Sequence, residues 1–179
     1  MAMTLIADNT ADTTDLASVS FTSGIDSTYK LYIFKFYEVN PATDAAHFQV
    51  EASTNGGSSY GITKTVLYFT STHTEADGGT GIAHDATYSI YNTTNAATLA
   101  HNMDDGADSN GSGELRLFNP SGTTYLKHYS STANVVFSAN GTGLRFSNGC
   151  WATTSAINAI KFSMSSGNMD AVISMWGLA

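Results

Sequence analysis

The sequence contains a single cysteine, Cys150, in a chain of 179 residues. One thiol cannot form an intrachain disulfide, and it cannot supply a cysteine-rich metal site. Cys150 precedes Trp151 in a strand-like segment, so we interpret it as a small buried hydrophobic side chain and not as a catalytic nucleophile. The stability of the chain must therefore come from packing or from assembly with other chains.

Charged side chains are also scarce, and the few basic ones are dispersed. They make up 12% of the chain, with Ser, Thr, Asn and Gly filling the polar positions instead. Seven Lys and Arg against 15 Asp and Glu give a net charge of -8. Because no basic stripe is available to neutralise phosphates, the composition argues against nucleic acid as a partner.

Long hydrophobic runs are missing as well. No segment reaches the roughly 18 consecutive apolar residues that a membrane-spanning helix needs. Residues 1–15 have neither a basic start nor a sustained apolar stretch, so we expect no signal peptide. The composition predicts a soluble protein that is made in the cytoplasm and does not bind membranes.

What the sequence does have is an alternation of apolar and polar residues with a period of two. From Ala46, every second residue is apolar through Ala52, which predicts a strand with one buried face. Residues 28–39 are rich in aromatic and β-branched side chains and stop at Asn40 and Pro41, so they form a second, longer strand.

Further short strands follow, separated by turns of Asn, Gly, Ser and Pro. We expect them near residues 60–69, 87–91, 114–118, 124–129, 133–138, 143–147, 156–164 and 171–176. This pattern predicts an all-β fold, an antiparallel, jelly-roll-like β-sandwich of about nine to ten strands. Residues 16–179 form the single domain, residues 1–15 a flexible N-terminal arm, and residues 71–86 and 101–114 long loops.

The sequence offers little for catalysis, and we predict that the protein is not an enzyme. It has no G-x-S-x-G motif, and its five histidines, which we expect on the surface, never stand at a metal-ligand spacing. A carboxylate pair for glycoside hydrolysis could come from Glu38, Glu51 and Glu114, but the sequence does not bring them together.

The second long loop holds most of the acidic residues. Asp104, Asp105 and Asp108 are hard oxygen ligands of the kind that calcium prefers. The spacing departs from an EF-hand, because Gly106 and Leu117 stand where acidic ligands belong. We interpret the loop as a solvated turn and keep calcium bound by the three aspartates as the alternative; no other cofactor is expected.

Several segments resemble small structural proteins of tailed bacteriophages. The similarity lies in turn and strand patterns, at residues 21–30, 53–60, 113–120, 153–169 and 173–178. The resemblance implies a β-sandwich that sits on a capsid as a decoration or cement subunit, or on a tail or fibre, often as a trimer. It carries no catalytic residues over to this chain.

On this basis we expect a virion structural protein, most simply a capsid decoration subunit that binds the major capsid protein or other virion proteins as a homotrimer. It would be made in the host cytoplasm and reside on the virion. The alternative is a tail or fibre component that binds carbohydrate or a receptor, with exposed Tyr88, Tyr91 or Tyr125 stacking on sugar rings.

Overall fold

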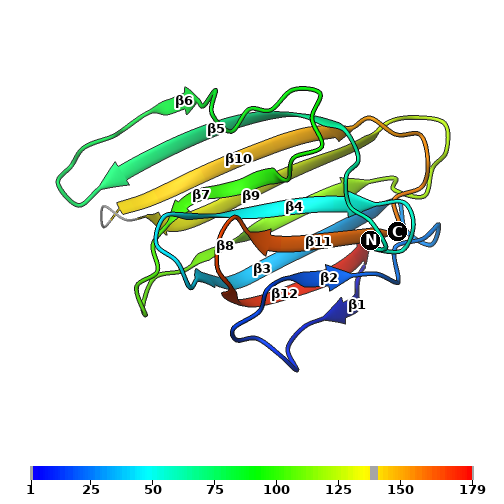
Figure 1. Cartoon of the computed structure of the whole chain (residues 1–179), viewed down its shortest axis with the longest axis horizontal. Coiled ribbons are helices and arrows are strands. Elements are labelled where there is room, and N and C mark those ends of the chain that lie inside the picture. The colour runs from blue at the N-terminus through cyan, green and yellow to red at the C-terminus, as the bar shows by residue number, and fades with distance from the viewer. Residues whose placement is uncertain (1, 138–140, 179) are drawn as a thin grey trace.

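The computed structural model describes residues 2–137 and 141–178, and it is built of twelve strands that pair only in antiparallel fashion (Figure 1). The strands are β1 (Met3–Asp8), β2 (Val19–Phe21), β3 (Leu31–Pro41), β4 (Ala46–Ser53), β5 (Lys64–Thr74), β6 (Ile82–His84), β7 (Ala97–Met103), β8 (Gly111–Phe118), β9 (Lys127–Phe137), β10 (Gly141–Trp151), β11 (Ala159–Met164) and β12 (Met169–Leu178). The predicted all-β antiparallel class is confirmed, with slightly more strands than expected. None of the described residues forms a helix long and apolar enough to cross a membrane.

The strands form two layers. The large sheet has the order β6-β5-β10-β9-β8-β3-β12-β1, and the small sheet has the order β7-β4-β11-β2. The layers join at one corner, where Met103 of β7 pairs with Phe137 of β9. In Figure 1 the small sheet lies in front of part of the large one, and the chain crosses repeatedly from one layer to the other.

An aromatic cluster holds the two layers together. Phe162 of β11 lies at its centre and is fully buried. Its ring stacks on Phe48 at 5.7 Å between centroids and meets Phe34 and Phe36 of the facing sheet at 5.5 and 5.9 Å. Phe21 of β2 closes the group at 6.4 Å. Tilted and edge-on ring pairs of this kind add to the free energy gained by burying the rings.

The prediction that residues 1–15 form a flexible N-terminal arm is wrong for residues 3–8. Met3–Asp8 form β1 and pair with β12, because the edge of β12 offers unpaired backbone groups that a neighbouring strand satisfies. Asn9 then fastens the end of β1: its side chain donates to the carbonyl of Ala171 at 2.8 Å and accepts from the amide of Ile173 at 2.7 Å. Residues 3–8 of the expected arm are thus part of the large sheet.

Replacing Phe162 with alanine should lower the free energy of unfolding by about 3 to 5 kcal/mol, because the mutation opens a cavity between the layers. Chemical denaturation followed by circular dichroism measures the loss. Leu67→Ala, on a half-exposed residue of β5, is the control and should cost less than about 1 kcal/mol. Equal losses for both variants would contradict the central position of Phe162.

Candidate functional site

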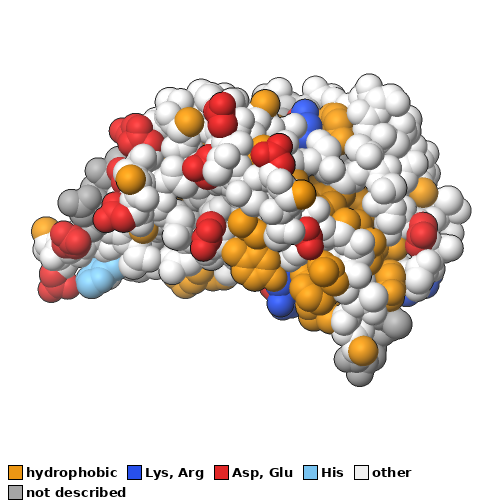
Figure 2. Space-filling model, turned by 90° about the horizontal axis from the view of Figure 1, so that it is seen from below, with side chains coloured by type: hydrophobic (Ala, Val, Ile, Leu, Met, Phe, Trp, Pro, Cys, Tyr) orange, Lys and Arg blue, Asp and Glu red, His pale blue; other side chains and the backbone are white. Residues whose placement is uncertain are grey.

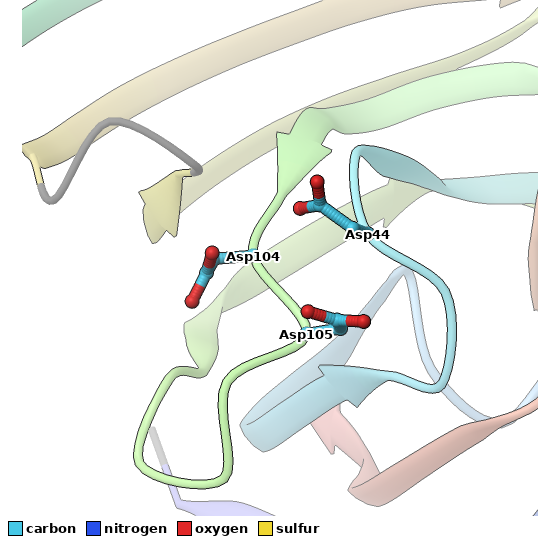
Figure 3. Close-up of side chains that lie close together, drawn as sticks. All are labelled: Asp44, Asp104 and Asp105. Atoms are coloured by element: carbon cyan, nitrogen blue, oxygen red, sulfur yellow. The ribbon is translucent and has the colours of Figure 1, made fainter.

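Three carboxylates meet at one corner of the sandwich (Figure 3). Asp44 lies in the turn between β3 and β4, and Asp104 and Asp105 follow β7. One oxygen from each residue lies within 4.8 Å of the others, and all three side chains are exposed or partly exposed. Such a group of hard oxygen donors can hold a divalent cation of the calcium type.

The third aspartate of the sequence prediction, Asp108, is not in this group. It lies farther along the β7–β8 loop and lines a shallow pocket with residues of the β5–β10 end. The sequence missed Asp44 because it is 60 residues away from Asp104. The only signal for it is indirect: β4 pairs with β7, which places the turn before β4 beside the loop after β7.

The acidic loop is held in shape by its own hydrogen bonds. Asp104 accepts from the amide of Gly106 at 3.1 Å and from the hydroxyl of Ser109 at 2.5 Å. From β3, the side-chain amide of Asn40 donates to the carbonyls of Gly106 and Ser109, at 2.8 and 2.5 Å. These bonds pair the amide and the carbonyl of Gly106 and the carbonyl of Ser109 within the protein.

If the aspartates bind calcium, millimolar calcium should raise the melting temperature, because a ligand that binds only the folded state stabilises it. The structure then predicts which variant abolishes this gain: Asp44→Asn should remove it, whereas Asp108→Asn should keep it. Differential scanning calorimetry with calcium and with EDTA measures the effect. A melting temperature that does not respond to calcium would leave only the solvated turn.

A second group of polar side chains lies between β5, β7 and residues 85–95. The imidazole of His101 is 8% exposed and stacks face to face on Tyr88, with 4.4 Å between ring centroids. Its Nδ1 shares a hydrogen bond of 3.0 Å with the hydroxyl of Tyr68. The expectation that all five histidines lie on the surface is therefore wrong for His101, because Tyr88 and Tyr68 cover it.

His47 extends the same group toward the surface. Its Nδ1 accepts from the backbone amide of Asn102 at 3.1 Å, so in the neutral ring Nε2 carries the proton. That N–H donates to the hydroxyl of Tyr88 at 3.3 Å. The bond to Asn102 stabilises a bulge in β7, where Asn102 has a φ of 52° and the register with β4 shifts.

Burial lowers the pKa of His101 to about 4, and the nearby Arg145 guanidinium adds to this effect. Burial also lowers the pKa of His47, again because the charged ring loses its hydration. The carboxylate of Asp85 raises the pKa of His101 and so opposes the shift, whereas His47, like Arg145, lowers it. Both rings are therefore held in the neutral form at neutral pH.

The free energy of unfolding should fall as the pH drops from about 6.5 toward 4. The unfolded chain binds a proton at His101 near its usual pKa, whereas the folded protein resists protonation until about pH 4. The lost stabilisation is about 3 kcal/mol at the acidic end of this window. His101→Gln should flatten the pH dependence in denaturant titrations, and His128→Gln, at an exposed position, should leave it unchanged.

A third candidate is the outer face of the large sheet, whose side chains form rows across the strands. Near the chain termini one row is apolar: Met3, Leu178, Leu31 and Phe118 follow one another across β1, β12, β3 and β8. Met3 and Phe118 are 38% and 43% exposed. Figure 2 views the molecule from the β1 and β12 edge and shows hydrophobic side chains gathered there beside a basic one, with acidic side chains spread over the adjoining surface.

Farther along the same strands the outer face is hollowed into an open groove of about 590 Å³. Its lining residues come from β3, β8, β9 and β10. Those whose side chains can form hydrogen bonds with a ligand are Lys35, Tyr37, Ser112, Glu114, Thr132 and Asn134. Tyr37 reaches this face by the ordinary alternation of a strand, because Phe34 and Phe36 are buried between the sheets. A bulge begins at the same place, where Tyr37 and Glu38 together oppose Ser112 of β8. Its side chain is 45% exposed.

Hydrogen bonds fix the aromatic side of the groove. The indole N–H of Trp176 donates to the Ser174 hydroxyl at 2.7 Å, and that hydroxyl donates to the Tyr37 hydroxyl at 3.3 Å. The Ser112 hydroxyl donates to the backbone carbonyl of Tyr37. The ammonium of Lys35 lies 5.9 Å from the Trp176 ring, a cation–π distance. Tyr37 is thus held at its backbone and at its ring tip.

The aromatic residues expected to bind sugars behave differently from one another. Tyr88 is stacked on His101 and is no open platform, whereas Tyr91 and Tyr125 are 82% and 77% exposed. The groove residue Tyr37 was not singled out from the sequence, although alternation along β3 places it on the face opposite Phe34 and Phe36.

The three glutamates considered for glycoside hydrolysis do not share a groove. Glu51 lies on the outer face of the small sheet, where its carboxylate pairs with Lys161 at 2.7 Å. Glu114 lies on the outer face of the large sheet, beside Arg116. Glu38 lines a different pocket, next to Asp170. Glu51 and Glu114 are on opposite outer faces of the sandwich.

Comparison of the chain with protein-family models, with curated proteins and with solved structures found no match.

Proposed function

We propose that the protein is a bacteriophage virion structural protein, a capsid decoration subunit that attaches to the major capsid lattice. What carries the proposal is the spatial grouping of the segments that resemble phage proteins. Residues 153–169, 113–120 and 173–178 include β11, most of β8 and most of β12, whereas residues 21–30 and 53–60 begin at the last residues of β2 and β4 and continue into the loops that follow. In the sheets, β2 and β4 are the neighbours of β11, and β8 and β12 flank β3. Together these strands surround the aromatic cluster of Phe162.

The apolar row of the outer face supports attachment to other proteins. Phe118 and Met3 end this row near the termini, and Leu5 and Leu126 are 47% exposed close to it in the sequence. Exposed apolar groups in a charge-poor surface are typical of surfaces that bind protein. We propose that this row forms the contact with the lattice or between three copies of the chain.

Mass spectrometry of purified particles of a phage that encodes this chain tests the proposal, together with light scattering of the isolated protein for the trimer. Particles that lack the subunit should take it up again from solution. Phe118→Thr should weaken uptake about ten- to a hundredfold, because it removes one large apolar side chain from the contact. Ile82→Thr, an exposed residue at the opposite edge of the sheet, should not weaken it.

Absence of the chain from the particles would contradict the virion role. A strict monomer that occupies single sites would contradict the trimer. If Phe118→Thr and Ile82→Thr are taken up as well as the original protein, the contact surface lies elsewhere.

The second candidate is a tail or fibre component that binds carbohydrate. The groove around Tyr37 favours it, because the groove combines a fixed aromatic ring with hydroxyl, amide and carboxylate groups.

A further inference from the structure

We infer that the groove across β3, β8 and β9 binds a neutral saccharide, with the ring of Tyr37 as the surface on which a sugar ring stacks. The groove is open, has a volume of about 590 Å³ and lies on paired strands of the sheet, not on a loop. This inference stands on the groove alone and does not depend on a location in the virion.

The aromatic wall is already arranged for binding. Tyr37 is the bulged residue of β3, its carbonyl accepts from Ser112, and its hydroxyl accepts from Ser174. The Ser174 hydroxyl is oriented in turn by the indole N–H of Trp176. A side chain fixed at both ends loses little conformational entropy when a ligand binds, and an aromatic ring supplies a large contact area.

The polar side chains of the groove suit a ligand that carries many hydroxyl groups. Glu114 and Thr132 are directly opposite each other on β8 and β9, and Ser112 and Asn134 are the next such pair on this face. Carboxylate oxygens accept, amide N–H groups donate and hydroxyls do both, so the wall can serve a ligand with many hydroxyls. Asn134 accepts from Thr142 through its amide oxygen at 2.8 Å, so its N–H groups are what it offers to a ligand.

The charges in and beside the groove favour a neutral ligand. Glu114 is engaged by Arg116, with Nη2 of the guanidinium 2.5 Å from a carboxylate oxygen. The one cation on the other wall, Lys35, is directed to the Trp176 ring. The protein as a whole carries a net charge of -8, which repels polyanions.

A peptide strand is a poor fit for the same place. The backbone groups of β3, β8 and β9 already pair with strands on both sides, so an extended peptide has no free edge to join. A saccharide needs no backbone partner: its apolar C–H face covers an aromatic ring and its hydroxyls bond to polar side chains. The groove offers this combination of one aromatic ring and several polar groups.

Isothermal titration calorimetry with four neutral oligosaccharides tests the inference: cellohexaose, maltohexaose, xylohexaose and chitohexaose. At least one should bind to the intact protein. Tyr37→Ala should weaken that binding about tenfold or more, since it removes the stacking surface. Tyr37→Phe keeps the ring and should retain most of the affinity, and Tyr125→Ala, on an exposed residue outside the groove, should retain all of it.

Two further measurements keep the test decisive. Circular dichroism and melting curves show whether each variant is folded, and Asn134→Ala, which also weakens binding, replaces Tyr37→Ala if that variant unfolds. Binding to none of the four saccharides overturns the inference, and so does binding that Tyr125→Ala abolishes and the groove variants leave intact. A protein that binds saccharide but is absent from virions contradicts only the virion role.

Discussion

The packing of aromatic rings between the two sheets is the constraint on which the rest of the structure depends. With one cysteine and few charges, the chain has no intrachain disulfide, and the ion pairs His73–Asp77 and Arg116–Glu114 lie at exposed or partly exposed positions where they stabilise little. Phe162 and its neighbours therefore decide which face of each strand is buried. Because side chains alternate along a strand, the same choice decides which residues reach the outer faces.

Two interruptions of this alternation lie beside the polar groups of interest. In β7 the bulge at Asn102 is stabilised by His47, which links the backbone of one strand to the tyrosines around His101. In β3 the bulge begins after Phe36, and Tyr37, which already faces outward, lies in it. In both cases the residue in the bulge is held by a specific hydrogen bond, from Asn102 to His47 and from Ser112 to Tyr37.

Sequence patterns predicted the strands with clear alternation and missed those without it. Residues 46–53 match β4, and the expected strand over 28–39 largely matches β3. The strand β7 was missed: the predicted loop over residues 101–114 includes its last three residues, and no strand was predicted for residues 97–100. Nearly all residues of Ala97–Met103 are buried, so the segment shows no period of two. One long strand, β9, was read as two, since small polar residues occupy its middle. Of the acidic corner, the sequence predicted Asp104 and Asp105 but not Asp44, because Asp44 comes close to Asp104 only through the pairing of β4 with β7.

The two ends of the described chain lie side by side, because β1 pairs with β12 and Met3 faces Leu178 (Figure 1). A tag, linker or second domain joined to either end would therefore leave the sandwich from the same corner. Two such additions would crowd each other and would cover the apolar row, while the β5–β10 end of the molecule would stay free. For the same reason, a short linker could join the two ends, so that new termini could be opened in a distant turn without breaking the order of the strands.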